Sequence, residues 1–120
     1  MKQAEFAGAL AKLTADGTPF AVATVVKTEG SSLGKPGFKV VISETGEVLH
    51  GSLGGVCPES AVTDIARETM KSGVPRTVKV YLESVEESVA AVVKGRKEDE
   101  THVETNCGGM MVIFVEPYLP

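Results

Sequence analysis

The amino-acid sequence predicts a single small domain of the α/β or α+β class, with a mixed β-sheet covered by about three helices. Segments with apolar residues at helical spacing alternate along the chain with short β-branched apolar runs, the pattern of a sheet with covering helices. The chain has 120 residues, enough to bury one core but too few for a catalytic domain beside a separate cofactor domain. Residues 1–120 are therefore expected to form one domain.

The chain begins with a predicted helix and a predicted buried strand. Phe6, Leu10 and Leu13 recur at helical spacing. They predict an amphipathic helix over residues 2–15, which a following glycine and proline bring to an end. The nearly continuous apolar run Phe20–Thr28 is typical of a strand covered on both faces.

A hairpin and a second helix are predicted next. The runs Phe38–Ser43 and Val48–His50 flank Gly46, a residue suited to the left-handed position of a hairpin turn. Apolar residues then recur at helical spacing over Val62–Met70, and a glycine and a proline follow. We therefore predict a second helix over residues 58–72.

The last third of the chain is predicted to hold two strands and a third helix. Thr77–Leu82 alternates moderately and predicts a strand. Ser84 then opens a capping box, and the helix that it starts is expected to end at Gly95. The charged run Arg96–Glu100 is interpreted as a solvated loop. Met110–Val115 is expected to be a buried final strand.

Composition excludes several classes of function. The formal net charge is -4, Trp is absent, and there are only 4 Phe and 2 Tyr, which argues against a nucleic-acid-binding surface. No apolar run approaches the roughly 20 residues of a membrane span. The N-terminal segment carries an acid at Glu5 and lacks the apolar core of a signal peptide. We therefore expect a cytoplasmic protein whose two cysteines are thiols rather than a structural disulfide.

One cysteine lies in the glycine-rich segment Gly51–Ser60, GSLGGVCPES. If Pro58 is the first helical residue, as proline favours, Cys57 occupies the N-cap. There the free N–H groups and the helix dipole favour a negative charge and a thiolate. Gly54 and Gly55 let the backbone approach a ligand closely. The loop is interpreted as a site for an anionic or metal-containing group beside a reactive sulfur; a tight turn with a buried cysteine is the alternative.

Two further segments have a similar character. Cys107–Gly109 is a second small-residue turn, so the two thiols either face one pocket or are unrelated turn residues. Glu29–Gly37 combines glycines, hydroxyls and a lysine but lacks the order of a P-loop, and a surface loop is the alternative to a ligand contact. His50 ends a predicted strand and His102 falls in the charged loop. Without a paired base beside a nucleophile, no catalytic triad is predicted.

Three pieces in order, Ala23–Ser32, Gly51–Glu59 and Cys107–Gly109, carry a family resemblance. Over roughly residues 7–117 the chain resembles the N-terminal domain of the xanthine dehydrogenase accessory proteins, the XdhC/CoxI family. The resemblance implies a chaperone, or maturation factor, that binds molybdenum cofactor (molybdopterin) as cargo. Such a protein protects the cofactor during sulfuration and helps to insert it into a molybdenum hydroxylase of the xanthine dehydrogenase or CO dehydrogenase type, without turnover of its own.

The resemblance also implies which residues bind the cofactor. By their positions in the three pieces and in the first loop, these are Gly30, Ser31, Ser32, Lys35, Gly54, Gly55, Cys57, Glu59, Cys107 and Gly108. Of these, Gly30, Ser31, Ser32 and Lys35 would contact the cofactor phosphate, and Cys57 and Cys107 are the candidates for the metal. A soft thiolate and backbone N–H groups suit such a ligand.

The implied partners are a molybdenum hydroxylase apo-enzyme, a cysteine desulfurase and a separate Rossmann-type chain, since most full-length relatives continue into a C-terminal Rossmann domain that is absent here. No nucleic acid or membrane partner is expected. Size alone makes a homodimer a further expectation. Two alternatives stay open: a thiol-dependent redox or sulfur-transfer protein, with Cys57 as nucleophile and Cys107 as resolving thiol, and a non-catalytic subunit that docks a separate Rossmann-type chain.

Overall fold

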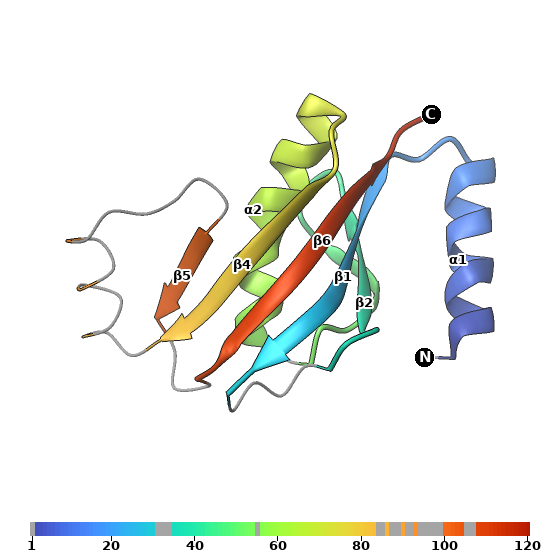
Figure 1. Ribbon diagram of the computed structural model, residues 1–120. Helices are drawn as coiled ribbons and strands as arrows, with labels where there is room; N and C mark the ends of the chain where they lie inside the picture. The colour runs from blue at the N-terminus through green and yellow to red at the C-terminus, as the bar shows by residue number, and fades with distance from the viewer. Residues whose placement is uncertain are drawn as a thin grey trace.

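A mixed β-sheet with one helix packed on each face makes up the described part of the chain (Figure 1). The residues that the computed structural model describes are 2–30, 35–54, 56–83, 86, 90, 93, 100–104 and 108–120. Within these ranges the elements are α1 (Gln3–Ala15), β1 (Phe20–Glu29), β2 (Lys39–Ser43), β3 (Val48–Gly51), α2 (Val56–Ser72), β4 (Arg76–Glu83), β5 (Glu100–Glu104) and β6 (Met110–Tyr118).

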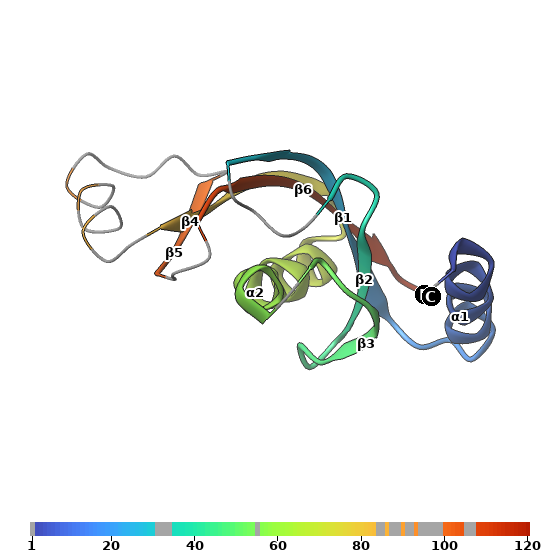
Figure 2. The same ribbon diagram turned by 90° about the horizontal axis from the view of Figure 1, so that it is seen from below.

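The strand order is β3-β2-β1-β6-β4-β5. Neighbouring strands are antiparallel except β4 and β5, which run parallel. Figure 2 shows α2 on one side of the curved sheet and α1 on the opposite side, beside β1 and β2. The predicted class, a mixed sheet with covering helices, is confirmed.

Strand β1 lies between β2 and β6 and is buried from both sides in its first half. Ala21, Ala23 and Val25 are fully buried in the core shared with α2. Phe20 and Val22 alternate with them and belong to a second cluster, which includes the apolar side of α1. This explains why the strand is apolar at nearly every position. Beyond the β-bulge that follows Val25, the strand is mostly exposed.

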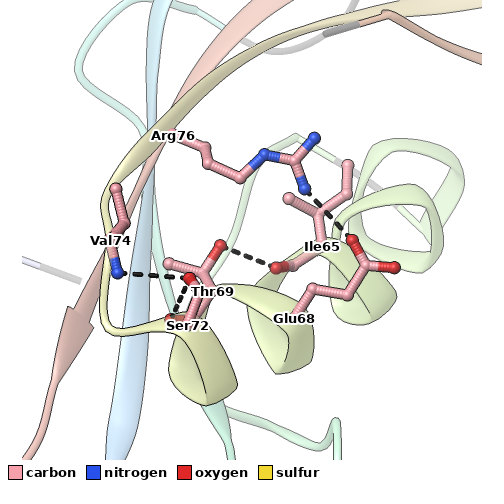
Figure 3. A network of polar contacts seen from close by, with 6 residues as sticks. All are labelled: Ile65, Glu68, Thr69, Ser72, Val74 and Arg76. Atoms are coloured by element: carbon pink, nitrogen blue, oxygen red, sulfur yellow. Dashed lines mark hydrogen bonds and ion pairs between the residues drawn. The ribbon is translucent and has the colours of Figure 1, made fainter. Parts of the chain in front are cut away.

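A set of polar contacts fixes the end of α2 and the entry into β4 (Figure 3). The buried hydroxyl of Thr69 donates to the carbonyl one turn earlier, at 2.7 Å. The hydroxyl of Ser72 donates to the Thr69 carbonyl at 3.3 Å and accepts from the Val74 N–H at 3.2 Å. Arg76 pairs with Glu68 at 3.1 Å. The Ser72 hydroxyl thus joins the last turn of α2 to the residues that follow it, and the Glu68–Arg76 pair ties the helix to β4.

Strand β5 was not predicted. His102 lies in this strand, so its expected placement in a charged loop was wrong. Its ring stacks on Tyr81, the opposite residue of the parallel pair, with 4.8 Å between ring centroids. In the described part of β5, only Val103 packs against the main core, so the strand has too little apolar alternation to be visible in the sequence.

The predicted helix from Ser84 to Gly95 lies largely outside the described residues, as do residues 96–99 of the predicted charged loop. Glu86, Ala90 and Val93 are described and are helical. No helix in the described ranges is long and apolar enough to cross a membrane.

Candidate functional site

Two of the glycine turns meet at the end of the sheet where β1 finishes and β6 begins. Gly30 directly follows β1, and Gly109 directly precedes β6. The last residue of β1, Glu29, pairs with the first residue of β6, Met110. A Cβ added to Gly30 would lie 3.0 Å from the Cα of Gly109. The backbones of the two turns are therefore in direct contact, which only glycine permits without a shift.

The conformation of these turns also requires glycine. Gly30, Gly108 and Gly109 have φ values of 74, 73 and 88°, in the left-handed region that L side chains rarely adopt. The carbonyl of Gly109 accepts a 2.9 Å hydrogen bond from the N–H of Leu82, near the end of β4. Gly109 thus ties the turn to β4 through this hydrogen bond and to β6, which begins at the next residue.

The first turn of α2 lies at this same end of the molecule, where the helix begins in green in Figure 1. The helix begins at Val56, so the expectation that Cys57 is the N-cap and Pro58 the first helical residue was wrong. Proline is tolerated here because the first four N–H groups of a helix have no intrahelical partner. Cys57 is the second helical residue and remains in the turn where the dipole favours negative charge.

Glu59 fixes the loop that precedes α2. Its Oε1 accepts a 3.1 Å hydrogen bond from the N–H of Leu53, whose side chain is fully buried in the main core. The N–H of Gly54 donates to the hydroxyl of Ser52 at 3.0 Å, and Gly54 has a φ of 105°. The Glu59 carboxylate therefore holds the loop that precedes α2 in place. This role favours helix initiation over direct contact with a ligand.

The described residues include six of the ten predicted site residues. Lys35 is exposed, and its carbonyl accepts a 3.0 Å hydrogen bond from the N–H of Phe38. Ser31, Ser32, Gly55 and Cys107 lie outside the described residues. The structure therefore brings Gly30 and Gly108 to one end, with the first turn of α2 at that end.

Among the described residues, no three His, Cys, Asp or Glu side chains gather into a group that could hold a metal ion. The described side chains therefore supply no preformed metal cage.

Sequence reasoning missed a groove of about 690 Å³ between α1 and the sheet, on the face opposite α2. Phe6, Phe38, Lys39 and Tyr118 are among its lining residues. Partial burial raises the pKa of the Tyr118 hydroxyl above its ordinary value of 10.0, and the nearby charge of Glu116 raises it further. The hydroxyl is therefore protonated at neutral pH. The lining residues come from distant parts of the sequence and form no motif.

Comparison with known proteins gives one family and one structural similarity. A model of the XdhC and CoxI family matches residues 13–81, more than half of the chain. The chain also resembles a crystal structure described as a xanthine dehydrogenase from Bacillus halodurans, with a TM-score of 0.65 and 26% identity. That match covers 92% of this chain but only 29% of the other. No curated protein sequence matches.

The family match confirms the resemblance predicted from the sequence. Ala23–Ser32 and Gly51–Glu59 lie inside the matched range, while Cys107–Gly109 lies beyond it. In the structure the first and third pieces are in contact, because Gly30 touches Gly109.

Proposed function

Because the chain belongs to the XdhC and CoxI family, we propose that it is an accessory protein of a molybdenum hydroxylase. It binds molybdenum cofactor as cargo, holds it during sulfuration, and passes it to an apo-enzyme of the xanthine dehydrogenase or CO dehydrogenase type. The similarity to a chain described as a xanthine dehydrogenase supports the link with this class of enzyme.

The observation that carries the proposal is the contact between Gly30 and Gly109, at the end of the sheet that also holds the first turn of α2. Backbone N–H groups in left-handed turns and at a helix N-terminus are suited to anionic oxygens. Molybdenum cofactor carries a phosphate, so this end supplies the donor groups that such a cargo needs. Cys57, the second residue of α2, is the proposed soft sulfur donor.

The remaining predicted residues have supporting roles in the proposal. Lys35 provides a positive charge beside the first loop, and Glu59 keeps the second loop in place through Leu53. Cys107 would complete a pair of thiols. A cysteine desulfurase would deliver the sulfur, and a separate Rossmann-type chain would assist the transfer.

Cofactor retention tests the proposal directly. The reduced protein is mixed without oxygen with molybdenum cofactor released from a donor enzyme, and retained molybdenum and pterin are measured together after gel filtration. We expect equimolar retention of both by the native chain and loss of both in the Cys57→Ser/Cys107→Ser double variant. Retention by the double variant equal to that of the native chain would show that the thiols are not part of the site.

Gly17→Ala and Gly30→Ala form a matched pair that tests the end of the sheet where Gly30 meets Gly109, which we call the glycine end. Gly17 has almost the same φ, 70°, but it precedes β1 whereas Gly30 follows it, and a Cβ there meets nothing within 4 Å. We expect Gly30→Ala to weaken cofactor retention and Gly17→Ala to leave it unchanged. If the native chain retains no cofactor, the proposal is wrong. Reversible formation of a Cys57–Cys107 disulfide would then favour the thiol-dependent alternative.

A further inference from the structure

The groove between α1 and the sheet has the size of a small-molecule site. Its volume is about 690 Å³, inside the range of roughly 300–1,000 Å³ that is usual for ligand pockets. Phe6 and Leu10 of α1 form one wall, and Val22 of β1 lies in the floor. The groove lies across the sheet from α2, so it is separate from the core that α2 covers.

Aromatic side chains are concentrated at this groove. The chain has 4 Phe and 2 Tyr, and Phe6, Phe38 and Tyr118 line the groove. Phe20 stacks against Tyr118 with 4.8 Å between ring centroids and an interplanar angle of 9°. Phe38 and Tyr118 keep 39% and 37% of their surface exposed. Four of the six Phe and Tyr residues therefore line the groove or stack on a residue that lines it. The rings of Phe38 and Tyr118 are exposed enough to stack against a flat ligand.

The groove also contains one charge of each sign. The ammonium of Lys39 lies 6.0 Å from the centre of the Phe6 ring, and Glu116 lies beside Tyr118 in the lining. In the described part of the chain, the ion pairs involve neither Lys39 nor Glu116. Both charges are therefore available to a ligand.

The sheet register sets the separation of the backbone positions that carry these two charged side chains. Lys39 of β2 pairs with Thr24 of β1. Glu116 of β6 pairs with Val22, two residues earlier on β1. With about 4.8 Å between strands and about 3.3 Å per residue, the two backbones are roughly 12 Å apart. That span fits a molecule of two or three aromatic rings with a short acidic substituent.

We propose that this groove binds a flat aromatic or heteroaromatic anion, with its rings against Phe38 and Tyr118 and its acidic group at Lys39. Glu116 and the protonated Tyr118 hydroxyl then face the far edge of the rings, where they accept from or donate to ring nitrogens. The proposal does not rest on the proposed function, because the described residues that line the groove include no cysteine and no predicted cofactor-binding residue.

Two fluorescent probes of the same shape test the ring contact and the charge contact separately. Anilinonaphthalene sulfonate carries an acidic group, and phenylnaphthylamine is its uncharged counterpart. We expect saturable binding of one anilinonaphthalene sulfonate per chain. Lys39→Gln should weaken its binding about tenfold by removing a charge-assisted contact and leave phenylnaphthylamine binding unchanged. Phe38→Ala should weaken both probes about tenfold.

The matched control is Lys79→Gln, an exposed lysine of β4 outside the groove, which should bind both probes like the native chain. Methyl resonances of Leu10 and Val22 should shift on probe addition, while those of Val112 on β6, outside the groove, should not. Equal effects of Lys39→Gln and Lys79→Gln, unchanged binding by Phe38→Ala, or shifts confined to Val112 would overturn the proposal. So would self-association that excludes the probe, because the groove would then be an interface between two copies.

Discussion

Replacing Gly30 by alanine tests whether the two glycine turns are in contact. The left-handed backbone costs a residue with a Cβ roughly 1–2 kcal/mol. The new Cβ would also meet the Cα of Gly109 at 3.0 Å, and relief of such overpacking adds about 1–3 kcal/mol because a backbone atom must move. Gly17→Ala has almost the same φ and no neighbour within 4 Å, so only the backbone cost applies to it.

The difference between these two variants is the informative quantity. Both alanines lower the conformational entropy of the unfolded chain by a similar amount, which stabilises each variant by about 0.4–1 kcal/mol. This contribution cancels when the two variants are compared. We expect Gly30→Ala to unfold at lower urea concentration than Gly17→Ala, with a free energy of unfolding about 1–3 kcal/mol smaller by linear extrapolation. A difference below about 0.5 kcal/mol, with equal m-values, would refute the close contact.

The remaining predictions concern the loop before α2 and the groove. Glu59→Gln should lower the free energy of urea unfolding by about 1 kcal/mol, because the Leu53 N–H loses a charged acceptor and the helix loses an acid in its first turn. Leu53→Ala, at a fully buried side chain, should cost about 2–5 kcal/mol in the same assay. The pKa of Tyr118 is higher in the folded chain than in the unfolded chain, where the hydroxyl loses its proton near pH 10. The free energy of unfolding should therefore fall as pH rises from about 10 through the folded pKa. In a Tyr81→Phe background, Glu116→Gln should move the tyrosinate absorbance titration to lower pH, and an unmoved titration would contradict the contribution of Glu116, which adds to that of burial.

The sequence predicted those elements whose own residues determine them. Strand β1 is apolar on both faces because helices cover both, and α2 shows a clear helical period, so both were visible in the pattern. The hairpin was visible because Gly46, at φ 91°, turns the chain between two short runs. Strand β5 was not, because it is an edge strand that gains its partner from β4 and contributes one apolar contact to the core.

In the candidate site, too, the sequence predicts local features but not the contacts between distant residues. The sequence marks Gly30 and Gly109 as turn residues, but it does not say that they touch. That follows from the pairing of β1 with β6, which are far apart in the chain. The start of α2 was predicted two residues late, because proline is acceptable throughout the first turn of a helix and so does not mark a unique position. The groove is lined by Phe6 of α1, Phe38 directly before β2 and Tyr118 of β6, and no local pattern in the sequence brings these three together.

The segment from Gly51 to Gly54 connects the glycine end with the groove. A variant that is to distinguish the two places must therefore leave this segment unchanged. Gly51 lines the groove, and a Cβ there would collide with the carbonyl of Lys39 and lie 3.3 Å from the ring of Phe6. Two residues later the Leu53 N–H is held by Glu59 at the start of α2. A substitution at Gly51 would therefore disturb both places through one backbone segment. Loss of cofactor retention or of probe binding in such a variant would not identify the site responsible, whereas Gly30→Ala and Phe38→Ala each change one place only.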